Sequence, residues 1–394
     1  MNISDLLASE ELRRKHFPIA DHQAFLAHAG VAALPLAAAK AVRDFADQGS
    51  RAQQERDFFK RVNHARATSA RLLGADSDEI ALLGPTALGL NLVADGLDWR
   101  EGDEVVCYQD DYPANVYPWL KLADRGVRCA LLETADGEQG RITWETVENA
   151  LTERTRLVAL ATANFASGTR IDVDAIGEKL HERGILFCLD GIQTLGAFPL
   201  RVTHVDFLSA DSHKWLLGPV GAGIFYVKKK HHDVLRPSLL GAWNVVSPEF
   251  VAQRKIEFYA GARRYECGTL NLPGIAGMAA SMELLLTVGV ENIAARLLAL
   301  KDYLAPRLTE IGFKIFGAQN LTVSEMSGIS SFLPPAQGRV NELASLLAAR
   351  KIAVSIRQDR AGRKLLRVSP HFYNTKAELD QLAAVCAEWA KKGT

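Results

Sequence analysis

The sequence of 394 residues lacks paired cysteines, an excess of either charge and any long uninterrupted apolar run. Its cysteines are scattered, at Cys107, Cys129, Cys188, Cys267 and Cys386. They form no Cys-x-x-Cys pair and no Cys/His group of zinc spacing, so we expect reduced thiols and no metal site. Lys and Arg together number 46, as do Asp and Glu, which argues against nucleic acid or an anionic membrane as a partner. A small, locally recognised ligand fits this composition better.

The sequence also lacks a signal-peptide core and a membrane-spanning segment. Its first residues, up to Lys15, are charged and amphipathic. The longest apolar region, residues 272–290, is interrupted by three glycines, a proline and Glu283, so we do not expect it to cross a membrane. Together with reduced cysteines, these features predict a cytoplasmic protein. The composition, 48% hydrophobic and 23% charged, is that of a globular protein with room for two domains.

Between residues 93 and 227, short runs rich in Val, Leu and Ile alternate with polar segments of helical length. The strand candidates are residues 104–108, 127–132, 156–161, 185–189, 205–208 and 224–227. Nearly continuous apolar strands separated by helices predict an α/β fold, with a mostly parallel sheet covered on both faces. Such sheets bind ligands beyond the carboxyl ends of their strands. Asp190 directly follows Leu189 and stands at one such end.

The last third of the chain predicts a second, smaller α+β domain. Residues 273–311 have the apolar spacing of a long helix followed by a second amphipathic stretch. Strand patterns and then a closing helix follow at residues 314–316, 328–333, 352–356 and 376–392. We therefore expect an N-terminal segment (1–24) packed with the small domain, a large ligand-binding domain (25–275) and a small C-terminal domain (276–394).

Lys214 is the residue that points most directly to chemistry. It follows the candidate strand 205–208 and precedes a glycine-rich turn, so it is held on a scaffold. An amine and the Asp190 carboxylate on two strand ends suit pyridoxal phosphate, because the amine forms a Schiff base and the acid keeps the pyridine nitrogen protonated. Asp190 and Gly191 could instead form a plain surface turn. Gln193 could reach the same ring if the chain turns helically.

Three further segments could hold the charged and flat parts of such a cofactor and its substrate. A Gly-Pro-Thr turn precedes an apolar helix at Thr86, where free amides and a hydroxyl suit an anion, although Thr86 could equally be a simple N-cap. Tyr112 follows a strand and could stack on a flat ring or pack in its loop. Arg367 lies in an apolar extended run, so it needs an anion, either a substrate carboxylate or an internal salt-bridge partner.

Together these residues resemble the class V group of fold-type I pyridoxal phosphate enzymes. The group holds cysteine desulfurases, selenocysteine lyases, isopenicillin N epimerase-like proteins and kynureninases. The resemblance covers residues 27–375, and the Asp190-x-x-Gln193 and His213-Lys214 pairs carry it most specifically. It implies a large domain with a sheet of the seven-stranded type and a small α+β domain. It also implies a homodimer in which Thr269 reaches the phosphate of the neighbouring active site.

The resemblance implies a role for individual residues of this sequence. The expected catalytic residues are Lys214 as the Schiff-base lysine, Asp190 at the pyridine nitrogen and Tyr112 over the ring. Gln193 is expected near the ring hydroxyl. Further contacts to the cofactor are expected from Thr86, Ala87, Asn164, Asp211 and His213. Arg367, Asn164 and His28 are expected to bind an amino acid substrate.

Three features depart from the desulfurase pattern. Asp211 stands in place of a serine, and its charge should not touch a phosphate, so either Asp211 orients His213 or Ser212 substitutes. Tyr112 matches the ring-stacking histidine, which removes an imidazole acid-base group. The loop of residues 355–364 contains no cysteine to accept sulfur as a persulfide. The substrate pocket could be lined by Arg357, Arg360, Arg363 and His28, which would favour a second acidic group on the substrate. The alternative is a solvated basic loop.

The predicted enzyme acts at the Cα of an amino acid, with Lys214 as general base at a pKa well below about 10.4. Proton return to the cofactor gives transamination, return to the other face of Cα gives epimerisation, and loss of a β substituent gives elimination or C–S cleavage. We rank aminotransferase first, C–S lyase second and epimerase third. A non-catalytic relative would not need Lys214 and its partners. A nicotinamide enzyme would need glycines between a strand and a helix, whereas residues 218–223 precede a strand.

Overall fold

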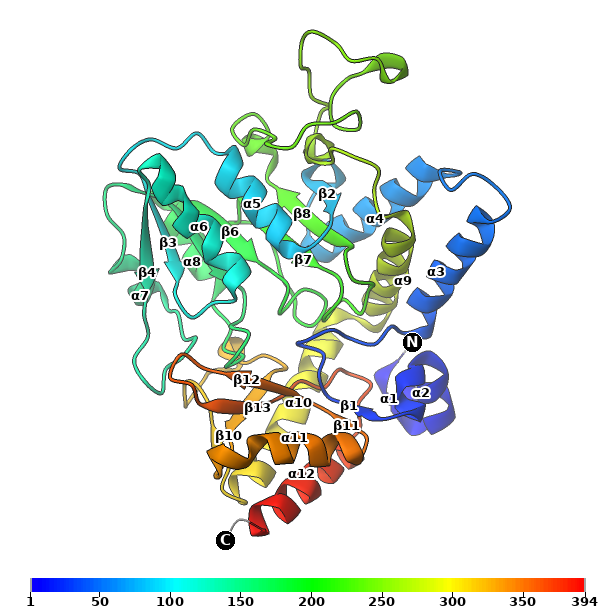
Figure 1. The fold of residues 1–394 in the computed structure, drawn as a ribbon, viewed down its shortest axis with the longest axis vertical. Coiled ribbons are helices and arrows are strands. Elements are labelled where there is room, and N and C mark those ends of the chain that lie inside the picture. Colours follow the sequence, from blue (N-terminus) through cyan, green and yellow to red (C-terminus); the bar gives the residue numbers. More distant parts are fainter. Residues whose placement is uncertain (1, 393–394) are drawn as a thin grey trace.

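The structure, a computed structural model, describes residues 2–392. Its larger part is built on a seven-stranded sheet in the order β2-β8-β7-β6-β5-β3-β4 (Figure 1). Strands β7, β6, β5, β3 and β4 pair in parallel, whereas β8 runs antiparallel to both of its neighbours. The bounds are β2 Ile80–Leu83, β3 Glu104–Tyr108, β4 Arg128–Leu132, β5 Thr155–Ala161, β6 Leu186–Asp190, β7 Phe207–Asp211 and β8 Gly223–Val227. The predicted α/β fold class is confirmed.

Apolar residues cover both faces of this sheet, because successive side chains of a strand point to opposite sides. Val106 and Val158 belong to one hydrophobic cluster, whereas Val105 and Leu157 belong to another. The first cluster includes residues of α4 Phe58–Leu73, α7 Trp144–Glu148, α8 Val173–Glu182 and α9 Leu272–Val288, and the second includes residues of α5 Thr86–Gly96 and α6 Tyr117–Leu120. Burial on two faces explains why the strands are apolar throughout.

Polar caps set the starts of several helices. Asp172 accepts a hydrogen bond from the Ala175 amide (3.0 Å) at the start of α8. Asn271 does the same for the Gly274 amide (3.1 Å) at the start of α9, with a proline in the first turn. Gly74, with φ 67°, ends α4 in the left-handed conformation that glycine adopts without strain. These local signals fix where α8 and α9 begin and where α4 ends.

A four-stranded antiparallel sheet, β12-β13-β10-β9, forms the smaller C-terminal part. Phe332, Ile356 and Leu366 on one face pack in a cluster with three helices, of which α11 and α12 lie below this sheet in Figure 1. The bounds are α10 Val290–Thr309, β9 Lys314–Ile315, β10 Ser330–Leu333, α11 Val340–Ala349, β12 Ser355–Gln358, β13 Lys364–Val368 and α12 Lys376–Lys391. The opposite face carries Arg367 and is turned toward the large sheet.

The N-terminal segment contacts the C-terminal part of the chain. It contains α1 Ile3–Ala8, α2 Glu10–His16 and the short strand β1 Ala24–Phe25, which pairs in parallel with β11 Ile352–Ala353. Arg13 lies 3.2 Å from Glu378, and the rings of Phe17 and Tyr373 stack with centroids 4.0 Å apart. These contacts join segments from the two ends of the chain.

Helices α9 and α10 connect the two parts of the molecule. Helix α9 packs on α3 Leu36–Gly49 and on α4, whereas α10 packs on α12, so the packing partners change at Gly289 between them. The division at residues 24 and 275 stays a prediction. Within residues 2–392, no single helix is long and apolar enough to cross a membrane; α9 and α10 meet that test only as a pair bent by 79°.

Candidate active site

Lys214 lies in a tight turn just beyond the end of β7. The Leu217 amide donates to the Lys214 carbonyl (3.0 Å), and Leu217 itself has a φ of 55°, which is costly for a branched side chain. A Cβ on Gly218 would lie 2.6 Å from the Ser212 Cβ, so this turn closes only with glycine there. The turn holds the lysine amine in the interior, with 8% of the residue exposed.

The environment of the Lys214 amine lowers its pKa to about 8. Burial is the largest cause, and the positive charges of Arg367 and Arg357 lower the pKa further. The carboxylate of Asp190 acts in the opposite direction. About a tenth of this amine is therefore unprotonated at pH 7, far more than of an ordinary lysine, and the unprotonated form is the one that a nucleophile or a general base requires.

Asp190 is the last residue of β6 and is buried. Its Oδ1 accepts a hydrogen bond from the Ile192 amide (3.0 Å), and among residues 2–392 no donor contacts its Oδ2. Burial raises the pKa of this carboxyl group, and the Lys214 charge lowers it. A cationic partner at the free oxygen would stabilise its ionised form.

Gln193 follows in the turn after β6 and is also buried. Its Nε2 donates to the Ala29 carbonyl (3.3 Å), and its Oε1 accepts from the indole of Trp215 (3.1 Å). The local chain forms hydrogen-bonded turns on the Gly191 carbonyl, in place of a regular helix. One N–H of the Gln193 amide stays available for a ligand.

The start of α5 lies next to the end of β7 and presents free donors there. Pro85 is the N-cap, and Thr86 is the first helical residue, so the Thr86 hydroxyl does not cap the helix. It accepts a hydrogen bond from the Asp211 amide (2.9 Å) and keeps its own proton to donate. The amides of Thr86 and Ala87 have no partner inside the helix and carry the positive end of its dipole.

Asp211 holds the imidazole of His213 beside this helix start. Its Oδ1 lies 2.6 Å from His213 Nδ1 and also accepts from the His213 amide (3.1 Å). Its Oδ2 accepts from the Gly221 amide (3.2 Å). Both carboxylate oxygens are thus occupied by donors of the same loop. This is the arrangement in which Asp211 orients His213 and leaves the other ring nitrogen for an anion.

Arg367 lies in the middle of β13 with 1% of its surface exposed. Its Nη1 donates to the Phe165 carbonyl (2.7 Å) and its Nη2 to the Ser355 hydroxyl (3.4 Å), whereas its Nε has no partner. It forms no ion pair within residues 2–392, so the expected alternative of an internal salt bridge does not occur there. Burial lowers its pKa to about 9. A bound carboxylate would compensate this buried charge.

Comparison with known proteins identifies the family. The family model of class-V aminotransferases matches residues 24–382, which is most of the chain. This chain belongs to the class-V aminotransferase family. The membership makes it a pyridoxal phosphate-dependent enzyme that acts on amino acids.

The curated relatives and the solved structures agree with that assignment. A probable cysteine desulfurase of Methanothermobacter thermautotrophicus is 30% identical over 352 residues, 85% of each chain. An uncharacterized aminotransferase of Bacillus subtilis, YcbU, is 28% identical over 382 residues, 95% of this chain and 97% of its own. The apo cysteine desulfurase of Thermococcus onnurineus matches with a TM-score of 0.88 at 23% identity, over 97% of this chain and 98% of that one.

The residues around Lys214 fit the cofactor of this family. The first amides of α5, the Thr86 hydroxyl and the His213 imidazole could donate to a phosphate, and the free Oδ2 of Asp190 suits a protonated pyridine nitrogen. Helix α5 comes close to β7 because Gly89 has no side chain: a Cβ there would lie 2.8 Å from the Ser209 Cβ. Unpaired donors and a buried, unpaired carboxylate oxygen are therefore gathered at one edge of the sheet.

Tyr112 lies beside Lys214, with the lysine Nζ 5.3 Å from the centre of its ring. The ring is half exposed and contacts Phe165 edge-on, with centroids 5.5 Å apart. Asp111, which the sequence did not single out, positions this tyrosine: its carboxylate accepts from the amides of Tyr112 (2.8 Å) and Ala161 (3.0 Å). Burial, helped by the charge of Asp190, raises the Asp111 pKa to about 7. An acid three residues after the end of β3 was the signal that could have revealed it.

Asn164 shapes a loop next to Arg367. Its Oδ1 accepts from the amides of Ala166 (3.0 Å) and Ser167 (2.9 Å), and its Nδ2 donates to the Asp110 carbonyl (3.0 Å). These bonds hold the Phe165 carbonyl that binds Arg367. The structure thus gives Asn164 a clear positioning role, and its contact with cofactor or substrate stays a prediction.

His28 belongs to the protein core and not to an open site. Its Nδ1 lies 2.9 Å from the Ser369 carbonyl and its Nε2 lies 2.8 Å from the Tyr373 hydroxyl. The residue is fully buried, and burial keeps its pKa well below the usual value. The expectation that His28 binds substrate is corrected here, because both ring nitrogens are already used.

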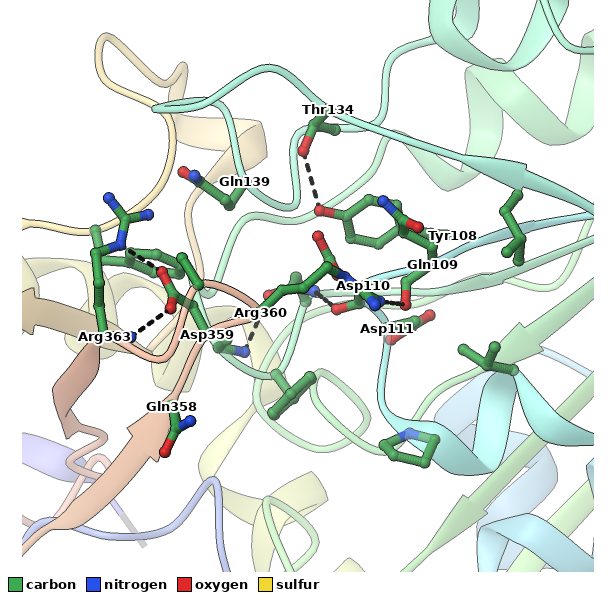
Figure 2. Close-up of a pocket in the computed structure, with 18 of the residues that line it drawn as sticks. Tyr108, Gln109, Asp110, Asp111, Thr134, Gln139, Gln358, Asp359, Arg360 and Arg363 are labelled. Carbon is green, nitrogen blue, oxygen red and sulfur yellow. Dashed lines mark hydrogen bonds and ion pairs between the residues drawn. The ribbon is translucent and has the colours of Figure 1, made fainter.

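A cavity of about 640 Å³ adjoins the site, between the loop after β3 and the hairpin of β12 and β13 (Figure 2). Asp111 and Asn164 are among its lining residues, whereas Lys214 is not. Arg360 forms an ion pair with Asp110 across it, and Arg363 lies 2.6 Å from Asp359 within the hairpin. These two arginines therefore already have anionic partners.

Thr269 is exposed on the segment before α9. It makes no hydrogen bond within residues 2–392. The neighbouring residues Gly268 and Leu270 line a smaller cavity of about 180 Å³ together with Phe58 and Trp243. In a single chain this threonine has no role at the site, so its expected reach into a partner's site stays a prediction.

Proposed function

We propose that this class-V family member transfers the amino group of an amino acid, with Lys214 as the residue that moves the Cα proton. The observation that carries the proposal is the buried Lys214 amine, with a pKa of about 8, set among Asp190, Arg367 and the free donors at the start of α5. Bound pyridoxal phosphate would act as an electron sink that makes the Cα proton of the amino acid removable. The chain supplies the remaining functions.

Each side chain of the site has one physical task in this proposal. Arg367 would bind the substrate carboxylate through its guanidinium, which orients the Cα–H bond toward the Lys214 amine. Asp190 would pair with the ring nitrogen and keep it protonated. Thr86, Ala87 and His213 would hold the phosphate. Lys214 would take the proton from Cα and deliver it to the cofactor carbon, which is the step that distinguishes amino transfer from epimerisation.

Cleavage of a C–S bond is the second candidate, and the names of the relatives favour it. A probable cysteine desulfurase is 30% identical to this chain over 352 residues. The segment from Ser355 to Lys364 nevertheless contains no cysteine. A C–S lyase built on this chain would thus release sulfur without passing it to a thiol of that loop.

We extend the proposal to the assembly and its compartment. Leu239, Leu240, Phe250 and Val251 are exposed on the loop that leads from β8 toward α9, and Phe59 is exposed as well. Apolar side chains on one such segment support a homodimer interface, next to the exposed Thr269. All five cysteines are free, which supports a reducing, cytoplasmic environment. Sedimentation of the purified protein tests the dimer: a monomer would contradict it.

Spectra and product analysis test the activity. The purified protein should show the absorbance band of lysine-bound pyridoxal phosphate, and Lys214→Ala should lose it. The enzyme is then mixed with single amino acids, while keto acid, sulfide and Cα deuterium exchange are followed. Keto acid together with the amine form of the cofactor supports amino transfer. Sulfide or pyruvate without the amine form supports C–S cleavage or elimination and rules out the first candidate.

A further inference from the structure

The small sheet presents a polar face toward the large domain. Ser331 and Ser355 are the register partners of Arg367 in the strands on either side of it, so all three side chains share one face. Arg357 stands two positions after Ser355 in β12 and therefore lies on the same face. The intervening Ile356 packs with the helices on the opposite side. The alternation thus directs two guanidinium groups, of Arg357 and Arg367, toward the active site.

These two arginines differ from their neighbours in having no anionic partner. Arg360 and Arg363 in the adjoining hairpin are ion-paired with aspartates. Within residues 2–392, neither Arg357 nor Arg367 forms an ion pair. Among the described residues, the Arg357 side chain makes one hydrogen bond, from its Nη1 to the Ile356 carbonyl (2.8 Å). Its remaining donors are free for a ligand.

The charges of Arg357, Arg367 and Lys214 are close enough to influence one another. Arg357 lowers the pKa of both Arg367 and Lys214, and burial lowers the pKa of Arg357 itself. Half-buried and buried cations that repel one another are unfavourable unless an anion joins them. One substrate carboxylate can neutralise Arg367. It leaves the charge of Arg357 uncompensated.

The segment before Gly30 connects Arg357 with the cofactor residues. A Cβ on Gly30 would lie 3.8 Å from Arg357 Nη2 and 3.1 Å from the Ala27 carbonyl oxygen, so the guanidinium passes directly by this glycine. The neighbouring Ala29 carbonyl accepts the hydrogen bond of Gln193 (3.3 Å). The Arg357 guanidinium therefore lies beside the same short segment that binds Gln193, a residue expected near the cofactor ring.

We propose that Arg357 binds a second anionic group, carried by the side chain of the amino acid substrate. The inference rests on the proposed function, since it takes Arg367 as the partner of the α-carboxylate. It names the substrate class as amino acids with an acidic side chain, either a carboxylate or a sulfinate. Arg357 is then a residue that determines specificity, and its planar guanidinium suits either oxyanion through two parallel hydrogen bonds.

Binding of unreactive acids to the protein loaded with pyridoxal phosphate tests this role directly. Succinate carries two carboxylates and propionate carries one, and calorimetry measures both affinities. We expect succinate to bind at least about 30-fold more tightly than propionate, because the second carboxylate meets a desolvated, unpaired guanidinium. Arg357→Gln should remove this preference, and Arg357→Lys should restore part of it.

Arg360→Gln is the matched control, because it removes the same charge from the same hairpin at a residue that already has a partner. It should keep the preference for succinate. Turnover of aspartate and of cysteine sulfinate, compared with alanine, then distinguishes a carboxylate from a sulfinate as the natural side chain. Because Arg357 also lowers the pKa of Lys214, Arg357→Gln affects every substrate, but kcat/KM should fall at least about tenfold more for the acidic substrates than for alanine.

The outcomes separate this inference from the proposed function. Equal affinity for succinate and propionate in the wild-type protein overturns the role of Arg357, as does a preference that survives in Arg357→Gln. Either result leaves the cofactor assignment intact, provided that the absorbance band of the bound cofactor is present. A protein that takes up no pyridoxal phosphate contradicts the proposed function itself.

Discussion

Replacing Lys214 by methionine should stabilise the protein freed of its cofactor. The pKa of the buried amine is lowered from 10.5 to about 8. At about 1.4 kcal/mol for each pH unit, the charged amine costs the folded protein about 3 kcal/mol at pH 7. Methionine has a similar length and no charge, so Lys214→Met should raise the free energy of unfolding by about that amount.

The stability gained by Lys214→Met should decrease as the pH rises. Because the pKa is lower in the folded protein, the unfolded chain binds more protons between pH 8 and pH 10.5, and wild-type stability rises with pH across that window. Below pH 8 the full cost is present. The advantage of Lys214→Met should therefore be about 3 kcal/mol at pH 7 and about 1 kcal/mol at pH 10.

Urea denaturation followed by circular dichroism, at pH 7 and pH 10, measures the effect. Lys60, which is exposed on α4, provides the control, and Lys60→Met should show no comparable pH-dependent gain. A Lys214→Met protein that is no more stable than wild type at pH 7 would refute the reasoning. So would a gain that stays constant up to pH 10.

Three further substitutions test other contacts. Gly89→Ala should lower the free energy of unfolding by about 1–2 kcal/mol in urea titrations, because its Cβ would press against Ser209; unchanged stability would contradict the close packing of α5. Arg13→Met should lower the free energy of unfolding in the same titrations by about 3 kcal/mol, since it leaves the Glu378 carboxylate near the N-terminal segment without its cation. A decrease below about 1 kcal/mol would show that the pair contributes little. Thr86→Val should weaken the binding of pyridoxal phosphate about tenfold in absorbance titrations, because valine cannot accept the hydrogen bond of the buried Asp211 amide. Thr86→Ser keeps the hydroxyl and should bind as wild type does. Equal affinities of all three proteins would exclude a role for the hydroxyl.

The sheet could be predicted well because strands that are buried on both faces are apolar at nearly every position. Residues 104–108 were expected as a strand and form β3 with the same bounds. The strand β2 was not singled out, since Ile80–Leu83 leads directly into the turn before α5 and was interpreted together with that turn and helix as one segment. Asp190 and Lys214 could be paired from the sequence because the carboxyl ends of neighbouring parallel strands meet at one edge.

Residues whose partners are distant in the sequence could not be placed in the same way. His28 is held by Ser369 and Tyr373, more than 300 positions later, and no local pattern indicates that both of its nitrogens are used. The sequence around Asp111 indicates only a loop, whereas the structure shows that the Asp111 carboxylate accepts a hydrogen bond from the Ala161 amide, 50 positions later. Side-chain roles of this kind depend on which loops lie side by side.

The sequence by itself determined the alternation of strands and helices and the position of the lysine and the acid, because periodicity and turn chemistry are local properties. Only the tertiary structure decided that Arg367 has no acidic partner within residues 2–392 and that Arg357 shares its face of the small sheet. The reason is physical: the cost of a buried charge depends on every group around it, and around Arg367 those groups, such as Phe165 and Ser355, are distant from it in the sequence or belong to another strand.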